Sequence, residues 1–343
     1  MDMLTPRQTA ALPYVKAWLI AVAVLIFCMV IVGGATRLTE SGLSITEWQP
    51  LLGAIPPLTE ADWRIAFNKY KLIPQYGALN QGMSLADFKF IFWWEWSHRL
   101  LGRFLAIAFF VPFAALALTH RIPRAVWPRL IAIFMLGGLQ GALGWYMVAS
   151  GLVDRVEVSQ YRLTAHLVFA TLIYGAILWV AMGLGRDRRG IPAGRRQWMA
   201  LLIVALLLAQ IAAGGFVAGL RAGLAYNSWP LMDGQLVPAG LFAMEPAWKN
   251  IFENAMTVQF DHRLLAYASA ILIAAFAYVV RSVASAFLLG AVVAQIALGI
   301  ATMLGHVPLA LALVHQGGAL VVFAAALWNL SLLLRRSPAP DRR

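Results

Sequence analysis

The chain has a single cysteine and few charged residues. Cys28 is the only thiol among 343 residues, so no disulfide can form within the chain, and charged residues make up 12% of the sequence. Soluble domains average about 25% charged residues. With a hydrophobic share of 61% and a mean hydropathy of +0.74, the composition excludes an ordinary soluble protein and indicates an integral membrane protein. Cys28 lies inside the first apolar stretch, where we expect it to pack as a small hydrophobic side chain.

Acidic residues are scarce as well, with 15 Asp and Glu against 27 Lys and Arg. A net charge of +12 occurs in nucleic-acid-binding proteins, but here the arginines gather in loops between apolar stretches and at the C-terminus. If eight helices alternate in direction, these groups share one side, and the positive-inside rule places that side and both termini in the cytoplasm. A secondary role in docking an acidic redox protein or anionic lipid stays open. The arginines concerned are Arg121, Arg124 and Arg129, then Arg186, Arg188, Arg189, Arg195 and Arg196, and finally Arg335, Arg336, Arg342 and Arg343.

Long apolar stretches are what the chain has most of, and a spanning helix needs about 20 such residues. The segment before the first stretch contains Arg7 and Lys16 but no small-residue cleavage site, so we interpret that stretch as a retained helix and not as a signal peptide. The sequence therefore predicts an all-α integral membrane protein with eight transmembrane helices. The stretches are 17–36, 91–118, 130–149, 163–184, 198–220, 264–280, 283–304 and 307–334.

The sequence repeats its own features in the same order. Four helices in each half keep both halves in one orientation, which predicts two parallel repeats related by a pseudo-twofold axis along the membrane normal. We expect residues 1–186 and 187–343 each to form a four-helix bundle, an arrangement that often builds cofactor sites from facing helices. The matched residues are Gly33-Gly34 and Gly214-Gly215, Gly42-Leu43 and Gly223-Leu224, Trp48 and Trp229, Gly53 and Gly234, His98-Arg99 and His262-Arg263, Gln140 and Gln295, Gly144 and Gly299, and His166 and His315.

The longest polar segment, about 37–93, is too polar to cross a membrane and forms a large outer loop. Thr59 and Ser84 each begin a capping-box pattern, which marks the start of a helix. We expect the first of these helices to be amphipathic and to lie over the mouth of the bundle, as interfacial helices do. The residues on its apolar face are Trp63, Phe67 and Tyr70.

Four histidines lie at matched depths, each about 20 residues or roughly 30 Å of helix before the arginine that closes its segment. Ionisable side chains inside a bilayer are costly and usually functional. Matched depth in a duplicated chain predicts two sites, each built from two histidines, and paired neutral imidazoles are the axial ligands that a six-coordinate haem iron takes. The four are His98, His166, His262 and His315, whereas His120 and His306 fall at the membrane boundaries, where we expect no ligation.

A metal site without haem is less favoured, since zinc or di-iron would need three or more clustered ligands. The one Glu-x-x-His pattern runs from Glu95 to His98, and Gln259 takes the place of Glu95 before His262. Residues three apart share a helix face, so we expect Glu95 to point into the first pocket. A carboxylate there suits chemistry, whereas the neutral second pocket suits a haem that only passes electrons.

Arginines accompany the histidines in both halves. Arg99 and Arg263 each follow a histidine directly, and we expect them to bind haem propionates through charge-assisted hydrogen bonds. An alternative role for Glu95 is an ion pair with Arg99 or Arg103. The sequence leaves both roles open.

Taken together, these residues resemble the haem A synthase family, membrane monooxygenases that mature haem for cytochrome c oxidase. The likeness covers nearly the whole chain. Its motifs are Gly33-Gly34-Ala35-Thr36-Arg37-Leu38-Thr39, Ser41-Gly42-Leu43-Ser44, Glu95-Trp96-Ser97-His98-Arg99 and one histidine in each of the fourth, sixth and eighth apolar segments.

The resemblance implies that His98 and His166 bind the substrate haem O, that His262 and His315 ligate a haem b cofactor, and that Glu95 is the catalytic carboxylate. The family's reaction oxidises one porphyrin methyl group to a formyl group by successive hydroxylations, after which the geminal diol loses water. Some members have two outer-loop cysteines. This chain has none there, which excludes a thiol relay through that loop and makes the chain similar to the cysteine-free proteobacterial and mitochondrial branch.

The resemblance also implies a setting and partners. It implies a multi-pass protein of the bacterial inner membrane. The candidate partners are haem O synthase, a ferredoxin-like or quinol electron donor, membrane lipids and a second copy of the chain. The sequence leaves open which donor is used, whether the synthase makes direct contact and what the oligomeric state is.

Two other functions stay open at this point. A di-haem cytochrome b that passes quinol electrons would also have paired histidines, although such proteins usually place their haems in both leaflets. A transporter would also have parallel repeats, but it predicts broken helices and polar residues deeper in the bilayer.

Overall fold

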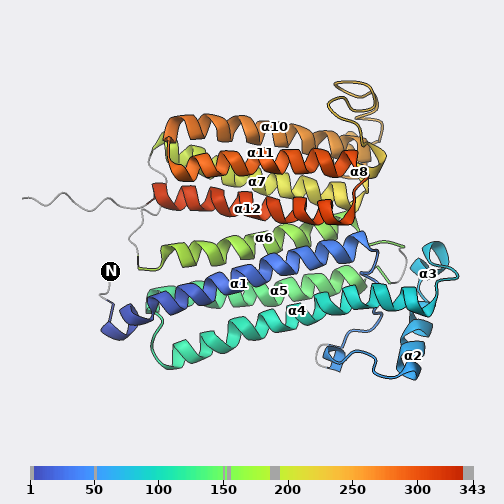
Figure 1. Ribbon diagram of the computed structural model, residues 1–343, viewed down its shortest axis with the longest axis horizontal. Helices are drawn as coiled ribbons and strands as arrows, with labels where there is room; N and C mark the ends of the chain where they lie inside the picture. Colours follow the sequence, from blue (N-terminus) through green and yellow to red (C-terminus); the bar gives the residue numbers. More distant parts are fainter. Residues whose placement is uncertain (1–3, 50–51, 150, 153–155, 186–193, 335–343) are drawn as a thin grey trace, which may run out of the picture.

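The computed structural model describes residues 4–49, 52–149, 151–152, 156–185 and 194–334, which form helices and loops with no strand among them. Eight of the described helices are long and apolar enough to cross a membrane, which confirms the predicted multi-pass membrane protein. Figure 1 shows them side by side along the long axis of the molecule. They are α1 (Pro6–Leu38), α4 (Leu85–Leu118), α5 (Trp127–Ala149), α6 (Gln160–Gly183), α7 (Arg195–Gly219), α10 (Ala255–Val280), α11 (Val283–Leu304) and α12 (Leu309–Leu333).

Most of the helices begin before the apolar stretches, because polar residues do not interrupt backbone hydrogen bonding. The largest differences are in α1, which begins at Pro6 and not at 17, and in α10, which begins at Ala255 and not at 264. The side chain of the α10 N-cap, Asn254, accepts from the amides of the first turn. Each of the eight is continuous over its described length, unlike the broken helices that a transporter predicts. Several of the predicted loop arginines lie outside the described residues: Arg186, Arg188, Arg189, Arg335, Arg336, Arg342 and Arg343.

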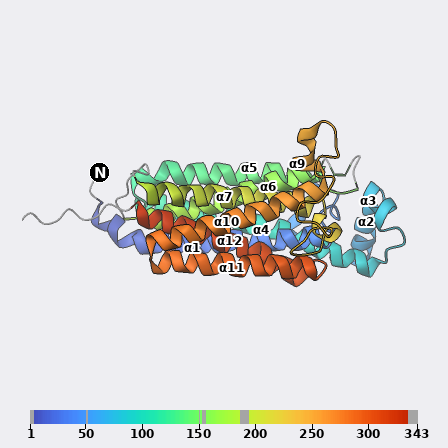
Figure 2. The ribbon, with the colours of Figure 1, turned by 90° about the horizontal axis from the view of Figure 1, so that it is seen from above.

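Corresponding helices of the two halves have corresponding neighbours. In the first half α1 packs against α4 and α6, and α5 packs against α6; in the second half α7 packs against α10 and α12, and α11 packs against α12. The halves meet where α6 packs on α7 and α1 packs on α12, while α6 and α12 lie side by side in the middle of the molecule (Figure 1). In the view turned by 90°, α5 and α11 lie at opposite edges (Figure 2).

One hydrophobic core runs through both halves. Ile177 of α6, Ile203 of α7, Phe276 of α10 and Leu320 of α12 are all at most 2% exposed and belong to it. Burial of large apolar side chains provides the packing that fixes the order of the helices. Cys28 is not part of this core. It is exposed on α1, which corrects our expectation, because neighbouring inward positions such as Ile26 and Val30 take the buried face of the helix.

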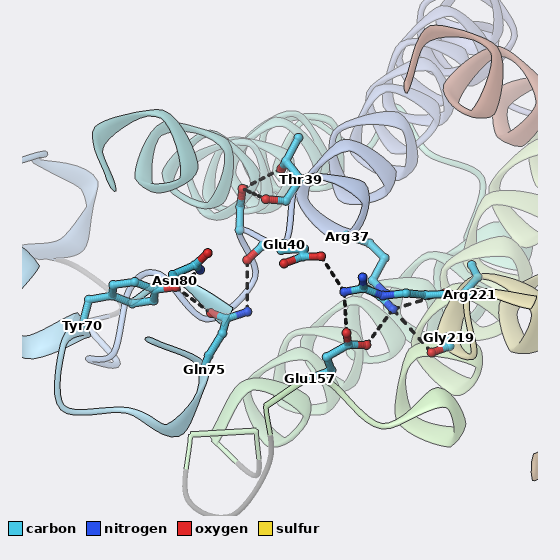
Figure 3. Close-up of polar contacts among 11 residues, drawn as sticks. Arg37, Thr39, Glu40, Tyr70, Gln75, Asn80, Glu157, Gly219 and Arg221 are labelled. Atoms are coloured by element: carbon cyan, nitrogen blue, oxygen red, sulfur yellow. Dashed lines mark hydrogen bonds and ion pairs between the residues drawn. The ribbon is translucent and has the colours of Figure 1, made fainter. Parts of the chain in front are cut away.

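Four charged side chains join the two halves near the ends of α1 and α7 (Figure 3). We call them the interhalf cluster; they are Arg37, Glu40, Glu157 and Arg221. Arg221 forms an ion pair with Glu40 at 2.6 Å and another with Glu157, which also accepts from Arg37 at 3.1 Å. Arg37 donates further to the carbonyl of Ala218. Positions 40 and 221, and likewise 37 and 218, are 181 residues apart, so each contact joins matched positions of the repeat.

The outer segment contains two short helices, α2 (Glu60–Tyr70) and α3 (Pro74–Leu79), and the capping boxes predicted at Thr59 and Ser84 are both present. The aromatic face of α2 packs on the N-terminal turns of α4, where the rings of Phe67 and Phe88 stack at 4.9 Å. The predicted face therefore meets protein and not the membrane surface, because α4 begins early enough to cover it. The buried residues of this contact are Trp63, Phe67, Tyr70, Phe88, Ile91 and Phe92.

A chain of hydrogen bonds links this outer segment to the interhalf cluster (Figure 3). The Tyr70 hydroxyl accepts from Asn80 at 2.6 Å and donates to Gln75 at 3.1 Å, and Gln75 donates to the carbonyl of Glu40 at 3.2 Å. Burial raises the pKa of the Tyr70 hydroxyl, so it stays protonated and keeps its role as a donor. The α2–α3 segment is thereby tied to the junction of the two halves.

Candidate functional site

Each of the four predicted histidines packs its ring against a glycine of the neighbouring helix. A Cβ atom built on that glycine would lie 3.4 Å from Cε1 of His98, 3.0 Å from that of His166, 3.2 Å from that of His262 and 2.7 Å from that of His315. Side chains larger than hydrogen would crowd these rings, so the glycines leave room for the imidazoles between helices. They are Gly33 of α1, Gly144 of α5, Gly214 of α7 and Gly299 of α11, in the same order.

The histidines lie in two groups of two. His98 and His166 are close enough to interact electrostatically, and so are His262 and His315. In the part of the chain that the structure describes, no three His, Cys, Asp or Glu side chains gather as a metal-binding group. Two imidazoles supply axial positions only, which suits an iron whose other ligands come from a porphyrin.

Unpaired nitrogen atoms in the first pair fit such a ligand. Nε2 of His98 and Nδ1 of His166 are buried without a hydrogen-bond partner, and buried polar atoms are normally paired. Gln140 donates to the backbone carbonyl of His166 at 3.0 Å and so holds its helix turn. Iron ligation would give a buried imidazole nitrogen the partner that the protein does not supply.

Glutamines hold the imidazoles of the second pair. Nε2 of Gln210 lies 3.2 Å from Nδ1 and 3.5 Å from Nε2 of His262, and Nε2 of Gln295 lies 3.1 Å from Nδ1 of His315. A partner on one ring nitrogen orients the ring and selects the tautomer that ligates a metal. The sequence pattern indicates Gln295 through its match with Gln140. It does not indicate Gln210, because the matched position of the first half is Met29.

His120 and His306 lie apart from both pairs. Both are exposed and occupy left-handed backbone positions in the turns after α4 and α11. Their positions agree with the boundary placement expected from the sequence.

Replacing Gly299 with Ala should displace His315 and lower the haem content of the second site several-fold, because the new Cβ would lie 2.7 Å from Cε1 of the ring. The optical spectrum of the purified protein measures this loss. Gly290→Ala is the matched control, since it lies on the same helix with no atom within 4 Å of its Cβ position. Equal haem content in the two variants would show that Gly299 does not support the ligand.

The carboxylate of Glu95 is 3% exposed and fully hydrogen-bonded. Its Oε1 accepts from Nε and Nη2 of Arg99 at 3.1 and 2.6 Å, and its Oε2 accepts from the Ser44 hydroxyl at 2.8 Å and the Ile45 amide at 2.7 Å. A carboxylate has about four lone-pair sites, and all are used. We expected the group to open into the pocket of His98; its bonds direct both oxygens to Arg99 and the turn after α1, and the ion pair with Arg99 is present.

Arg99 and Arg263 make equivalent contacts in the two halves. Each guanidinium donates to two backbone carbonyls in the turn that follows α1 or α7, and the two sets of carbonyls are again 181 positions apart. The distances are 2.8 Å to Ile45 and 2.8 Å to Glu47 for Arg99, and 3.2 Å to Tyr226 and 2.9 Å to Ser228 for Arg263.

The two arginines differ in what they have left to donate. Nε of Arg99 is used by Glu95, whereas Nε and Nη1 of Arg263 are buried without a partner. Unpaired buried guanidinium donors are suited to a carboxylate ligand such as a haem propionate. The geometry therefore fits Arg263 to that role better than Arg99.

The second half lacks the fixed carboxylate. Gln259 is 4% exposed, its amide nitrogen lies 3.3 Å from the sulfur of Met303, and its oxygen is buried without a partner. Ala225 occupies the position that matches Ser44. The sequence analysis identifies the difference between Glu95 and Gln259 but not the role of Ser44. The difference between Ser44 and Ala225, which are 181 positions apart, is nevertheless visible in the sequence.

The chain is similar to known proteins over most of its length. The chain matches the family model of the cytochrome oxidase assembly protein, COX15-CtaA, over residues 16–327. It is 53% identical over 324 residues to the heme A synthase of Parvibaculum lavamentivorans, covering 93% of this chain and 94% of that protein. It is 51% identical over 336 residues to the heme A synthase of Nitrosospira multiformis, covering 94% of each chain. The match to the heme A synthase of Azorhizobium caulinodans is 53% over 337 residues, covering 94% of this chain and 95% of that protein. The chain belongs to the COX15-CtaA family of cytochrome oxidase assembly proteins.

Proposed function

We propose that this protein is a haem A synthase, an enzyme that converts haem O to haem A by oxidising one methyl group to a formyl group. Relatives of that name match it at about half identity over most of its length. The observation that carries the proposal is the histidine pair His98 and His166, each with a buried ring nitrogen that has no partner, in the half that also holds the fixed carboxylate of Glu95.

We assign the substrate to the first half and the cofactor to the second. His98 and His166 would hold haem O, and His262 and His315 would hold haem b. The assignment is supported by the carboxylate of the first half and by the neutral second site, where glutamines contact both imidazoles. Arg263 would hold a haem b propionate through its unpaired Nε and Nη1. When bound, haem b supplies a redox centre between the electron donor and the first site.

The reaction adds oxygen to one carbon twice. The methyl group becomes a hydroxymethyl group, then a geminal diol, and the diol loses one water to leave the formyl group. An oxygen-atom source and an electron donor are required, and we propose a ferredoxin-like protein or a quinol as the donor. Haem O synthase is the proposed source of the substrate.

Glu95 acts in this scheme as a fixed negative charge. Its lone pairs are already occupied by four donors, which favours stabilisation of positive charge at the substrate methyl group over proton transfer. Arg99 neutralises part of that charge on the Oε1 side, so the pair forms an oriented dipole. The effect requires Glu95 to lie nearer the reacting carbon than Arg99.

We further propose that residues 1–186 and 187–343 are parallel repeats about a pseudo-twofold axis, with both termini in the cytoplasm and the protein in the bacterial inner membrane. The corresponding neighbours of the helices and the matched contacts of Arg99 and Arg263 support the repeat. The ends of α4 and α6 lie at the same end of the bundle as the start of α1 (Figure 1), as the positive-inside argument requires. Membrane lipids and a second copy of the chain are the remaining proposed partners.

Purification from cells that lack their own haem A synthase should give different haems with and without a co-expressed haem O synthase. With it, the protein should contain haem b together with haem A or haem O; without it, haem b alone. Chromatography of the extracted haems makes the measurement. Haem b alone in both preparations would contradict the proposal and favour the di-haem electron-transfer alternative.

A further inference from the structure

We propose that Ser44 is a positioning residue for Glu95. This proposal rests on the proposed function, because it explains how the first half holds the carboxylate that the reaction uses. The turn that contains Ser44 and Ile45 would then be as much a part of the active site as Glu95 itself.

Two donors from this turn converge on one carboxylate oxygen. Ser44 is 2% exposed, and its hydroxyl donates to Oε2 of Glu95 at 2.8 Å, while a second acceptor, the carbonyl of Ile91, is farther away at 3.4 Å. The amide of Ile45 donates to the same oxygen at 2.7 Å. Hydrogen bonds to a charged acceptor are the strong class, so the carboxylate cannot rotate without losing two of them.

The turn also has backbone hydrogen bonds of its own. The amide of Ser41 donates to the carbonyl of Thr36 at 2.9 Å, and that of Ser44 donates to the carbonyl of Ser41 at 3.0 Å. Nη2 of Arg99 donates both to the Ile45 carbonyl and to Oε1 of Glu95, at 2.8 and 2.6 Å. Glu95, Ile45 and Arg99 therefore form a closed ring of contacts, and such support preorganises a reactive group.

The second half serves as an internal comparison. Arg263 contacts the matched carbonyls of its turn, so the turn and the arginine are retained there. The hydroxyl and the carboxylate are both missing, because Ala225 replaces Ser44 and Gln259 replaces Glu95. The serine hydroxyl thus occurs in the half that has a carboxylate to hold. A positioning role requires this distribution, whereas a role in packing the turn would not.

Ser44→Ala should lower the kcat of formyl formation by about tenfold to 100-fold, the loss expected for one hydrogen bond to a charged group. The KM for haem O and the content of both haems should not change. Ser44→Thr, which keeps the hydroxyl, should restore most of the rate. Ser285→Ala is the matched control, because it removes a buried serine hydroxyl at the start of α11, and it should leave the rate unchanged.

An infrared measurement tests the same contact without turnover. The carboxylate stretching band that disappears in Glu95→Gln should shift in Ser44→Ala and stay in place in Ser285→Ala. A wild-type rate in Ser44→Ala, an unshifted band, no rescue by Thr, or a loss of bound haem in proportion to activity would each overturn the role of Ser44. Absence of haem A formation by the wild-type protein would instead contradict the proposed function, and the infrared shift would still test the contact.

Discussion

Replacing Glu95 with Gln should stop formyl formation while both haems stay bound. The variant keeps the size of the side chain but removes the negative charge and the ion pair with Arg99. Loss of one preorganised electrostatic contact typically lowers kcat by about 100-fold to 1,000-fold. Haem content should persist because the proposed ligands are on other residues. The rate of haem A formation and the optical spectrum measure the two effects.

Glu60→Gln is the matched control for this change. Glu60 and Arg64 form an ion pair at 2.6 Å with the same four-residue spacing as Glu95 and Arg99, but on the exposed surface of α2. Surface pairs of this kind contribute little, so the control should keep the wild-type rate. Haem A formation by Glu95→Gln at the same rate as Glu60→Gln would rule out a catalytic role for Glu95.

Alanine at His98 and alanine at His262 should remove different haems. His98→Ala takes an axial ligand from the proposed substrate site, so the protein should retain haem b and lose haem O. His262→Ala should lose haem b and accumulate unconverted haem O. Formation of haem A should fall to the detection limit in both, and chromatography of extracted haems separates the two results.

His306→Ala is the control for the histidine variants, since His306 is exposed in the turn between α11 and α12. It should match the wild type in both haem content and rate. Loss of the same haem from His98→Ala and His262→Ala would show that the two pairs do not form separate sites. Loss of haem b from His98→Ala alone would reverse the assignment of substrate and cofactor.

The sequence predicts the membrane-spanning helices well because they depend on local composition, and the histidine pairs are predicted from the same local spacing. About 20 apolar residues suffice to cross a bilayer, and equal spacing from the ends of the segments sets equal depth. Helix ends are less predictable, as α10 shows, because the caps and not the apolar residues determine where hydrogen bonding begins.

Contacts between distant segments account for what the sequence does not predict. Spacing along α4 places Glu95 near His98, but its orientation depends on Ser44 and Ile45, which are 51 and 50 positions away. With Glu95 held in this orientation, Nε of Arg99 donates to its carboxylate, whereas Nε of Arg263 has no partner. Arg263 is therefore the better ligand for a propionate. The sequence does not show what the aromatic face of α2 contacts, since a membrane surface and the end of α4 are both apolar.

The ion pair between Glu40 and Arg221 bears on how such a molecule can arise. In an isologous contact across a twofold axis, matched positions of two identical subunits carry the same residue. Under the proposed pseudo-twofold relation, a dimer of two identical half-length chains would set two glutamates or two arginines against each other here, and like charges at this distance repel. The attractive pair requires two positions that have diverged in sequence. A single chain that contains both halves can therefore form an ion pair between matched positions that a dimer of identical half-length chains could not form.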